Sequence, residues 1–171
     1  MKSGNILLIG FMGVGKGSLA RELARRKGSF AIDTDDLIES FENRKIRRIF
    51  KEEGEQYFRN LEQQVAKWLQ DNVRNTIIST GGGFFAVDNL REIGTVVFLK
   101  SSFNAILNKI NNHPNAEKKL KKRPLFRDVG QAEKLFHARQ PLYAAKADFI
   151  IDVEGKSAPE IANSLIEQIP S

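Results

Sequence analysis

A glycine-rich run that contains one lysine, Gly10–Ser18, carries the clearest chemical signal in the sequence. It follows the apolar run Ile6–Ile9 and precedes a helical pattern, Leu19–Ala24. A strand, a glycine loop with a lysine and a helix form the context of a phosphate-binding P-loop. The glycines allow backbone N–H groups to face an anion, the helix start adds further unpaired N–H groups, and Lys16 supplies a full positive charge. The run therefore predicts a polyphosphate site rather than a simple glycine turn.

The loop departs from the usual pattern directly after its lysine. P-loops normally have Ser or Thr at this point, where the hydroxyl binds Mg²⁺. This sequence has Gly17 there, and the hydroxyl follows one residue later, at Ser18. Because successive helical residues point about 100° apart, Ser18 is not expected to take over the same ligand geometry. The loop thus predicts phosphate binding with an altered metal contact.

Two carboxylates, Asp33 and Asp35, follow a second apolar run. In phosphoryl transfer, one carboxylate would lie near Mg²⁺ and the other would hold the acceptor hydroxyl. The alternative is that the string Asp33-Thr34-Asp35 only caps the helix that follows it. Both interpretations stay open at this point, since a capping residue can also face a cleft.

Three consecutive glycines, Gly81, Gly82 and Gly83, follow a third apolar run. Fixing a glycine in regular structure costs roughly 0.5–1 kcal/mol, and a tight turn needs only one of them. Three glycines therefore indicate that a ligand lies directly against this backbone.

Three arginines stand apart in apolar or aromatic surroundings: Arg59, Arg123 and Arg139. A guanidinium group suits a carboxylate or a phosphate. The alternative for each is an ordinary surface ion pair, and Arg59 is three residues from Glu62 on a predicted helix, where the two can pair.

Short apolar runs alternate with helical patterns, which predicts a parallel sheet with helices on both faces. The predicted strands are 6–9, 29–32, 76–79, 95–99 and 148–151. The predicted helices are 15–26, 55–72, 103–110, 132–145 and 158–168. Ligands of such sheets bind beyond the carboxyl ends of the strands. The P-loop, the aspartate pair and the three glycines are therefore expected to meet at one cleft.

The segment 111–128 is polar and basic and has no apolar periodicity. It is predicted to be a mobile excursion over the cleft, with a disordered surface loop as the alternative. No linker, repeat or low-complexity tract interrupts the chain, and 171 residues predict a single domain over 1–171.

Composition excludes several classes of function. A hydrophobic content of 41% with 28% charged residues is typical of a soluble globular protein. No apolar run reaches the length of a membrane span, and no signal peptide is expected, which predicts a cytoplasmic protein without a membrane partner. The absence of cysteine and the presence of only two histidines exclude a thiolate metal site and argue against a histidine site. The net charge of +6 is concentrated near residues 118–127, where a phosphate-rich small ligand explains it without nucleic acid.

Taken together, these motifs resemble shikimate kinase, in order from about residue 5 to residue 151. The matching residues are Gly10–Lys16, Asp33-Thr34-Asp35 with Ile38-Glu39, Phe58-Arg59 with Glu62, Ser79–Gly83, Arg123-Pro124-Leu125, and Arg139 with Pro141-Leu142-Tyr143. The resemblance implies a three-layer α/β/α P-loop kinase fold with a five-stranded parallel sheet in the order 2-3-1-4-5. It implies a substrate-binding region at about 34–62 and a lid at about 111–128. It also implies transfer of the ATP γ-phosphate to the 3-hydroxyl of shikimate with Mg²⁺, as part of aromatic amino-acid synthesis.

The resemblance also implies roles for individual residues. ATP would be held by Gly13, Val14, Gly15, Lys16, Gly17, Ser18 and Arg123, with Lys16 and Arg123 also catalytic. Asp35 would bind the shikimate hydroxyls and orient or deprotonate the attacking one, and Asp33 would lie near the metal through water. Arg59 and Arg139 would bind the shikimate carboxylate, while Gly81, Gly82 and Gly83 would contact the ring. Met12, Phe50 and Phe58 would form apolar walls, and Lys109 aligns loosely with an arginine beside adenine.

Gly17 is the departure from this family, and it leaves other functions open. Adenylate kinases also have Gly-Lys-Gly followed by a hydroxyl residue, so a nucleoside-monophosphate kinase of the same fold is an alternative. Against it, the pair Asp33 and Asp35 would repel a phosphate acceptor. Further alternatives are a nucleotide-binding module that lost turnover through Gly17 and a basic nucleic-acid binder. The favoured hypothesis is an active, monomeric kinase with weakened Mg²⁺ affinity.

Overall fold

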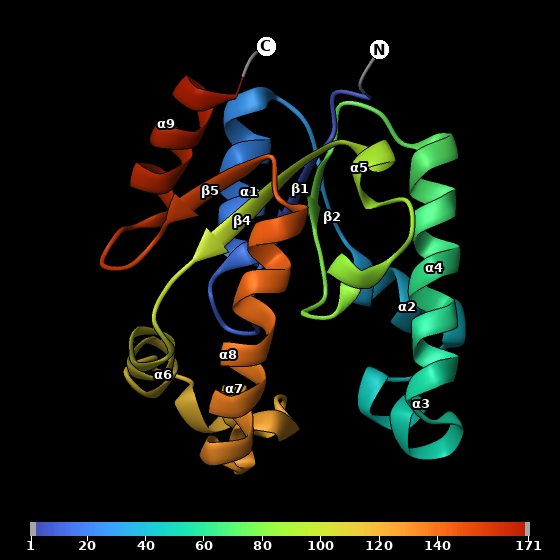
Figure 1. The fold of residues 1–171 in the computed structure, drawn as a ribbon, viewed down its shortest axis with the longest axis vertical. Helices are drawn as coiled ribbons and strands as arrows, with labels where there is room; N and C mark the ends of the chain where they lie inside the picture. The colour runs from blue at the N-terminus through green and yellow to red at the C-terminus, as the bar shows by residue number, and fades with distance from the viewer. Residues whose placement is uncertain (1–2, 170–171) are drawn as a thin grey trace.

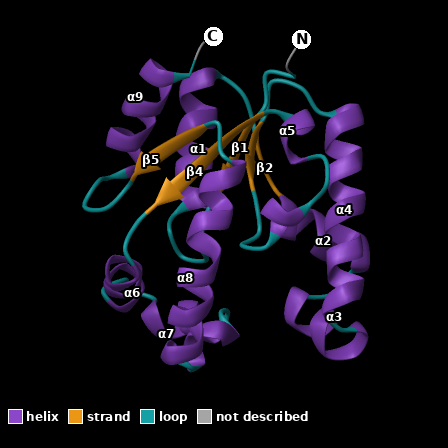
Figure 2. Cartoon of the chain, viewed as in Figure 1, coloured by secondary structure: helices purple, strands orange, loops and turns teal. Residues whose placement is uncertain are grey.

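The computed structural model describes residues 3–169, which form a five-stranded parallel sheet between two layers of helices (Figures 1 and 2). The strand order is β2-β3-β1-β4-β5, and every neighbouring pair is parallel. Helices α1 and α9 pack against each other on one face of the sheet, and α8 crosses the opposite face (Figure 1). The fold class and strand order predicted from the sequence are confirmed.

The elements have the following bounds. The strands are β1 (Ile6–Ile9), β2 (Ala31–Asp33), β3 (Ile77–Ser79), β4 (Thr95–Lys100) and β5 (Phe149–Asp152). The α-helices are α1 (Lys16–Lys27), α2 (Thr34–Glu42), α3 (Ile46–Glu53), α4 (Glu55–Asn72), α5 (Leu90–Ile93), α6 (Phe103–Asn111), α7 (Ala116–Lys121), α8 (Val129–Lys146) and α9 (Ala158–Gln168). Two 3₁₀ turns are η1 (Phe84–Ala86) and η2 (Pro124–Arg127).

The register of the central strands aligns their carboxyl ends. Leu8 of β1 lies beside Ser79 of β3, and Ser79 lies beside Asp33 at the end of β2. All four residues of β1 are buried, as expected for a parallel strand covered on both faces. The loops after β1, β2 and β3 therefore emerge next to one another, as the strand-end rule predicts.

A second, smaller apolar cluster is formed by side chains of α2, α3 and α4, apart from the main core. It consists of the buried side chains Ile38, Ile49, Phe58 and Leu61. These helices lie on one side of the carboxyl edge of the sheet, and α6 and α7 lie on the other (Figure 1). Two groups of helices therefore flank the edge of the sheet at which the P-loop, the aspartate pair and the glycine run meet.

The structure corrects several element boundaries. The second strand occupies 31–33 rather than 29–32, which brings Asp33 into the strand end. Helix α8 begins at Val129 rather than at residue 132, because the Asp128 side chain accepts a hydrogen bond from Gln131 N and caps it. Helices α3 and α5 were not predicted, since each is short and depends on tertiary packing, and α2 was expected only as the helix that the aspartate pair would cap.

The segment 111–128, which the sequence predicts to be a mobile excursion over the cleft, contains α7 and η2 in the structure. Leu120 and Leu125 pack against the main core, and Phe126 is buried in it. These few apolar contacts hold the basic helix α7 against the core. Apolar periodicity does not predict such a helix, because the segment is too short for a repeat to be seen.

Within residues 3–169, none of the helices combines the length and the apolar character that a bilayer crossing requires.

Candidate active site

The P-loop forms around the amino end of α1, and Lys16 lies at its centre. Lys16 is only 8% exposed, and its Nζ donates to Gly10 O at 2.6 Å and to Phe11 O at 3.1 Å. Burial lowers the pKa of Lys16 to about 8, although the charges of Asp35 and Asp33 oppose this shift. The two carbonyls hold the ammonium group in place over the loop, ready for an anion.

Glycine is required inside the loop by backbone geometry and by close contacts. Gly13 and Gly15 have φ values of 87° and 109°, which a residue with a Cβ rarely adopts. A Cβ on Gly13 would lie 2.9 Å from Ile110 Cδ1 and 3.5 Å from Arg123 Nη1. Arg123, from the segment predicted to be a lid, therefore reaches the P-loop in this structure.

The Asp33 side chain caps α2, as the alternative interpretation of the aspartate pair proposed. Its Oδ1 accepts hydrogen bonds from Asp35 N at 2.9 Å and Asp36 N at 3.1 Å. The buried hydroxyl of Thr34 accepts a hydrogen bond from Gly81 N at 3.0 Å. These contacts fix the start of α2 and connect it to the glycine run. Sequence reasoning assigned no such link to Thr34, and its place between two polar residues at a strand end is the only signal for it.

Asp35 has an enclosed carboxylate with an unused oxygen. Its Oδ1 is buried and has no hydrogen-bond partner within the described residues. Burial, together with the nearby charges of Asp33 and Glu62, raises the pKa of Asp35 to about 7. A carboxylate with this pKa and a free oxygen is suited to accept a proton near neutral pH.

The three consecutive glycines face three different charged side chains. A Cβ on Gly81 would lie 2.6 Å from Asp35 Oδ1. The equivalent atom on Gly82 would lie 3.3 Å from Arg139 Nη1 and 3.8 Å from Met12 N of the P-loop. On Gly83 it would lie 2.6 Å from Arg59 Cζ. The glycine run therefore allows an acid and two guanidinium groups to approach the same stretch of backbone.

Arg59 is held by a carboxylate on its own helix. Its Nη1 donates to Glu62 Oε2 at 2.7 Å, and its Nη2 donates to Glu55 at 3.2 Å. The pairing with Glu62 that the sequence left open is thus present. Glu62 is only 2% exposed, and burial raises its pKa in spite of the charge of Arg59. Its second oxygen has no partner among the described residues, so Glu62 orients Arg59 from inside the protein.

Tyr143 supports the other arginine and was given no role by the sequence analysis. Its hydroxyl donates to Gly82 O at 2.7 Å, and burial raises its pKa to about 12. Arg139 lies four residues earlier on α8, with its guanidinium carbon 6.0 Å from the ring centre of Phe85. The tyrosine thus fixes the glycine run beside Arg139.

Comparison with known proteins agrees with this geometry. The family described as shikimate kinase matches residues 12–170. A shikimate kinase of Helicobacter hepaticus is 40% identical over 163 residues, covering 95% of this chain and 94% of the relative. One from Persephonella marina is 35% identical over 170 residues, covering 96% and 98%.

Solved structures give the same result. A shikimate kinase from Acinetobacter baumannii in complex with shikimate has a TM-score of 0.83 and 30% identity, covering 95% of this chain and 90% of the other. The structure from Aquifex aeolicus has a TM-score of 0.76 and 31% identity, covering 95% and 94%. The chain belongs to the shikimate kinase family. It is accordingly an ATP-dependent kinase with the P-loop kinase fold.

A cavity beside the P-loop of this shikimate kinase family member has a volume of about 300 Å³. It is lined by Val14, Ser101, Ala105, Ile106, Lys109 and residues 153–156. Lys109 Nζ donates to Val14 O at 3.4 Å, so this side chain lies between the cavity and the loop. Lys109, which the resemblance places beside adenine, is among the residues that line this cavity, and its contact with adenine stays a prediction.

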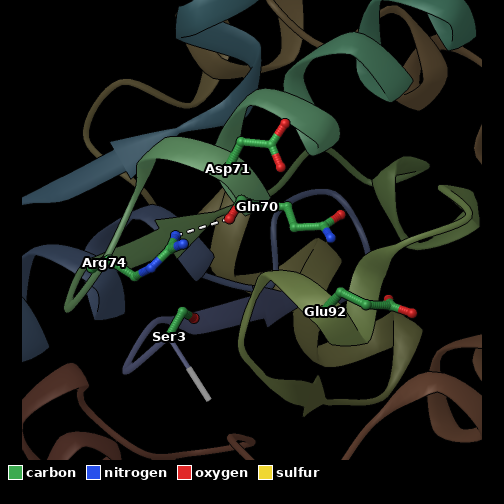
Figure 3. A pocket seen from close by; sticks show the side chains of 5 residues that line it. All are labelled: Ser3, Gln70, Asp71, Arg74 and Glu92. Carbon is green, nitrogen blue, oxygen red and sulfur yellow. Dashed lines mark hydrogen bonds between the residues drawn. The ribbon is translucent and has the colours of Figure 1, made fainter. Parts of the chain in front are cut away.

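Another cavity, of about 360 Å³, lies at the opposite edge of the sheet (Figure 3). It is lined by Ser3, Gln70, Asp71, Arg74 and Glu92. These residues precede the strands rather than follow them, and Arg74 Nη1 donates to Gln70 O at 2.8 Å. The shikimate kinase motifs contribute nothing to this cavity, so its size does not make it the active site.

The side chains near the P-loop provide few oxygen ligands for a metal ion. Gly17 has no side-chain oxygen, and the exposed Ser18 hydroxyl accepts a hydrogen bond from Arg21 at 3.5 Å. Asp33 uses Oδ1 as a cap, which leaves its second oxygen. Within residues 3–169 no group of three metal-binding side chains occurs. This set fits Mg²⁺, which commonly binds through one carboxylate, phosphates and retained waters.

Proposed function

We propose that this chain transfers the γ-phosphate of ATP to the 3-hydroxyl of shikimate, giving shikimate 3-phosphate and ADP. The observation that carries the proposal is the arrangement around the glycine run. Asp35, Arg139 and Arg59 approach three successive glycines, and Met12 of the P-loop lies at the same place. Shikimate has one carboxylate and three hydroxyls, which match two guanidinium groups, one carboxylate and exposed backbone groups.

The acceptor side has the groups for a proton transfer. Asp35 holds the attacking hydroxyl and takes its proton on Oδ1, while the hydroxyl oxygen bonds to the γ-phosphorus. The bond from the γ-phosphorus to the bridging oxygen breaks, and its electron pair leaves with ADP. Arg59 and Arg139 hold the shikimate carboxylate, so that the ring stays in line with the phosphate.

The donor side has fixed positive charge. Lys16 and the amides of residues 13–18 hold the outer phosphates, and Arg123 approaches Gly13 from the lid segment. Mg²⁺, when bound with ATP, neutralises phosphate charge, and Asp33 would hold it through water. Closure of the lid at about 111–128 excludes water from the reaction.

The proposal also covers organisation. The chain acts as one kinase domain, 1–171, with a substrate-binding region at about 34–62 whose small core is separate from the main one. Residues 1–2 and 170–171 lie outside the described residues. The monomeric state, the cytoplasmic location and the role in aromatic amino-acid synthesis belong to the same proposal and rest on the sequence analysis alone.

The direct test is ADP release with shikimate as the acceptor, with AMP, CMP and UMP as competing acceptors. Shikimate should support turnover, and phosphorus NMR should show a phosphomonoester on the 3-oxygen. Turnover with a nucleoside monophosphate instead would favour the nucleotide kinase. ATP binding without transfer to any acceptor would favour the inactive nucleotide-binding module.

Replacing Gly83 with alanine should raise the KM for shikimate by roughly 10- to 100-fold and leave the affinity for ATP unchanged. The added Cβ would lie 2.6 Å from Arg59 Cζ and would push the guanidinium group off its position. The backbone of Gly83, with φ −102°, accepts alanine, so the fold is retained. Gly130→Ala is the matched control, because its Cβ would meet only Asp128 at 3.5 Å. Equal KM values in the two variants would contradict this assignment.

Replacing Gly17 with serine should lower the Mg²⁺ concentration that gives half-maximal rate. The new hydroxyl restores the usual P-loop ligand, and the nearest atom to its Cβ, Arg21 Nη1, is 3.5 Å away. Gly17→Ala controls for the effect of a side chain on the helix. The prediction is wrong if serine leaves the requirement unchanged or raises it, or if alanine lowers it equally.

A further inference from the structure

The lid segment contains several lysines besides Arg123, and one lysine of α7 is less exposed than its neighbours. Lys119 is half-buried, whereas Lys118, Lys121 and Lys122 are exposed. Lys119 and Arg123 are four residues apart, and although α7 ends at Lys121 and Arg123 has φ −123° and ψ 80°, Arg123 N still donates to Leu120 O at 3.1 Å. The charges of Arg123 and Lys109 both act on Lys119, so the Lys119 side chain lies near both cations.

One face of this segment is directed toward the protein. Ala116, Lys119, Leu120 and Arg123 have helical spacing and are all partly buried, and Leu120 packs on the main core. Arg123 Nη1 lies near Gly13, and Lys109 Nζ lies near Val14 O, so the same region borders the P-loop from two elements. Lys119 thus lies near two cations that contact the P-loop.

No negative charge within residues 3–169 balances this group. None of Lys109, Lys119 and Arg123 forms an ion pair with an acidic side chain in the described part of the chain. Partial burial and the charges of Arg123 and Lys109 lower the pKa of Lys119. Three cations that repel one another lose that repulsion when a polyanion lies between them.

We propose that Lys119 is a second phosphate-binding cation of the lid, which contacts the polyphosphate of ATP together with Arg123. This inference deepens the proposed function and rests on its ATP site, not on the identity of the acceptor. Lys119 then helps to hold the lid on the nucleotide. Its charge adds to the phosphate contacts of a P-loop that has Gly17 where a hydroxyl residue is usual.

Isothermal titration of Lys119→Gln with ATP, ADP and AMP tests the contact. The affinity for ATP should fall roughly 5- to 20-fold, as expected for one charge-assisted contact, and the loss should shrink as phosphates are removed. Lys118→Gln is the matched control, because it removes the same charge from the exposed face of the same helix. Lys119→Arg should restore most of the affinity, and the slope of ATP affinity against salt should be smaller in Lys119→Gln than in Lys118→Gln.

The outcomes separate this inference from the proposed function. If Lys119→Gln and Lys118→Gln bind ATP equally well, or if AMP is affected as strongly as ATP, the contact does not exist. If wild type binds ATP with the expected variant effects but does not use shikimate, the inference stands and the acceptor assignment fails. If wild type binds no ATP, both fail. In steady state the KM for ATP should rise in Lys119→Gln while the KM for shikimate stays near that of wild type.

Discussion

Asparagine in place of Asp35 should lower kcat by about 10²- to 10⁴-fold, the range of a general base, and leave ATP affinity unchanged. The amide keeps the size of the side chain but cannot take the proton of the attacking hydroxyl. Asp36→Asn is the control, because Asp36 is exposed on the same helix turn. Coupled ADP release and nucleotide titration measure the two effects. Full activity in Asp35→Asn would remove Asp35 from the mechanism.

The pH dependence of wild type provides a second readout. Since burial and nearby carboxylates raise the pKa of Asp35 to about 7, kcat/KM for shikimate should rise with pH through about 7. Asp35→Asn should lose this rise. A pH profile that keeps its acidic limb in the variant would assign the limb to another group.

The same shift has a consequence for stability. The folded protein holds a proton on Asp35 up to about pH 7, whereas the ordinary pKa is 3.8. Between these values the unfolded state binds fewer protons, so the charge on Asp35 lowers the free energy of unfolding as pH rises. Asp35→Asn should therefore raise Tm above pH 7 and change it little below pH 4. A variant that is inactive and more stable excludes misfolding as the cause of its inactivity.

Methionine in place of Lys16 should reduce kcat by about 10³-fold or more, because the developing phosphate charge loses its nearest buried cation. The side chains have similar shape, and the lost donors are those to Gly10 O and Phe11 O, so the fold should persist. Lys27→Met, at the exposed end of the same helix, should keep full activity. Stopped assays with ATP and shikimate, together with a melting curve, measure the effect.

Lys16 also gives a pH test of its own. Burial lowers its pKa to about 8, so the free enzyme should lose ATP affinity as pH rises above about 8. Lys16→Met should bind ATP more weakly and without this pH dependence. If the variant keeps both the affinity and the pH dependence of wild type, Lys16 does not hold the phosphates.

The sequence predicted the sheet because its signals are local and repeated. Five apolar runs alternate with helical patterns, and Gly10–Ser18 has its spacing within a single loop. Short helices escaped prediction for the opposite reason. Helix α3 is stabilised by Ile49 packing against Phe58 and Leu61, residues that follow it in the chain. A helix of this length is not stable without such tertiary contacts.

By itself, the sequence determined which chemical groups this protein has and at which edge of the sheet they stand. Parallel strands send their carboxyl ends the same way, so Lys16, Asp35 and Gly81–Gly83 had to meet. Only the tertiary structure decided which side chain faces which glycine, that Thr34 binds Gly81, and that Lys119 turns inward while Lys118 does not. The burial of each side chain and its distance from other segments decide these contacts and the pKa values. A local stretch of sequence contains neither the burial nor the distance, because both depend on how distant segments pack.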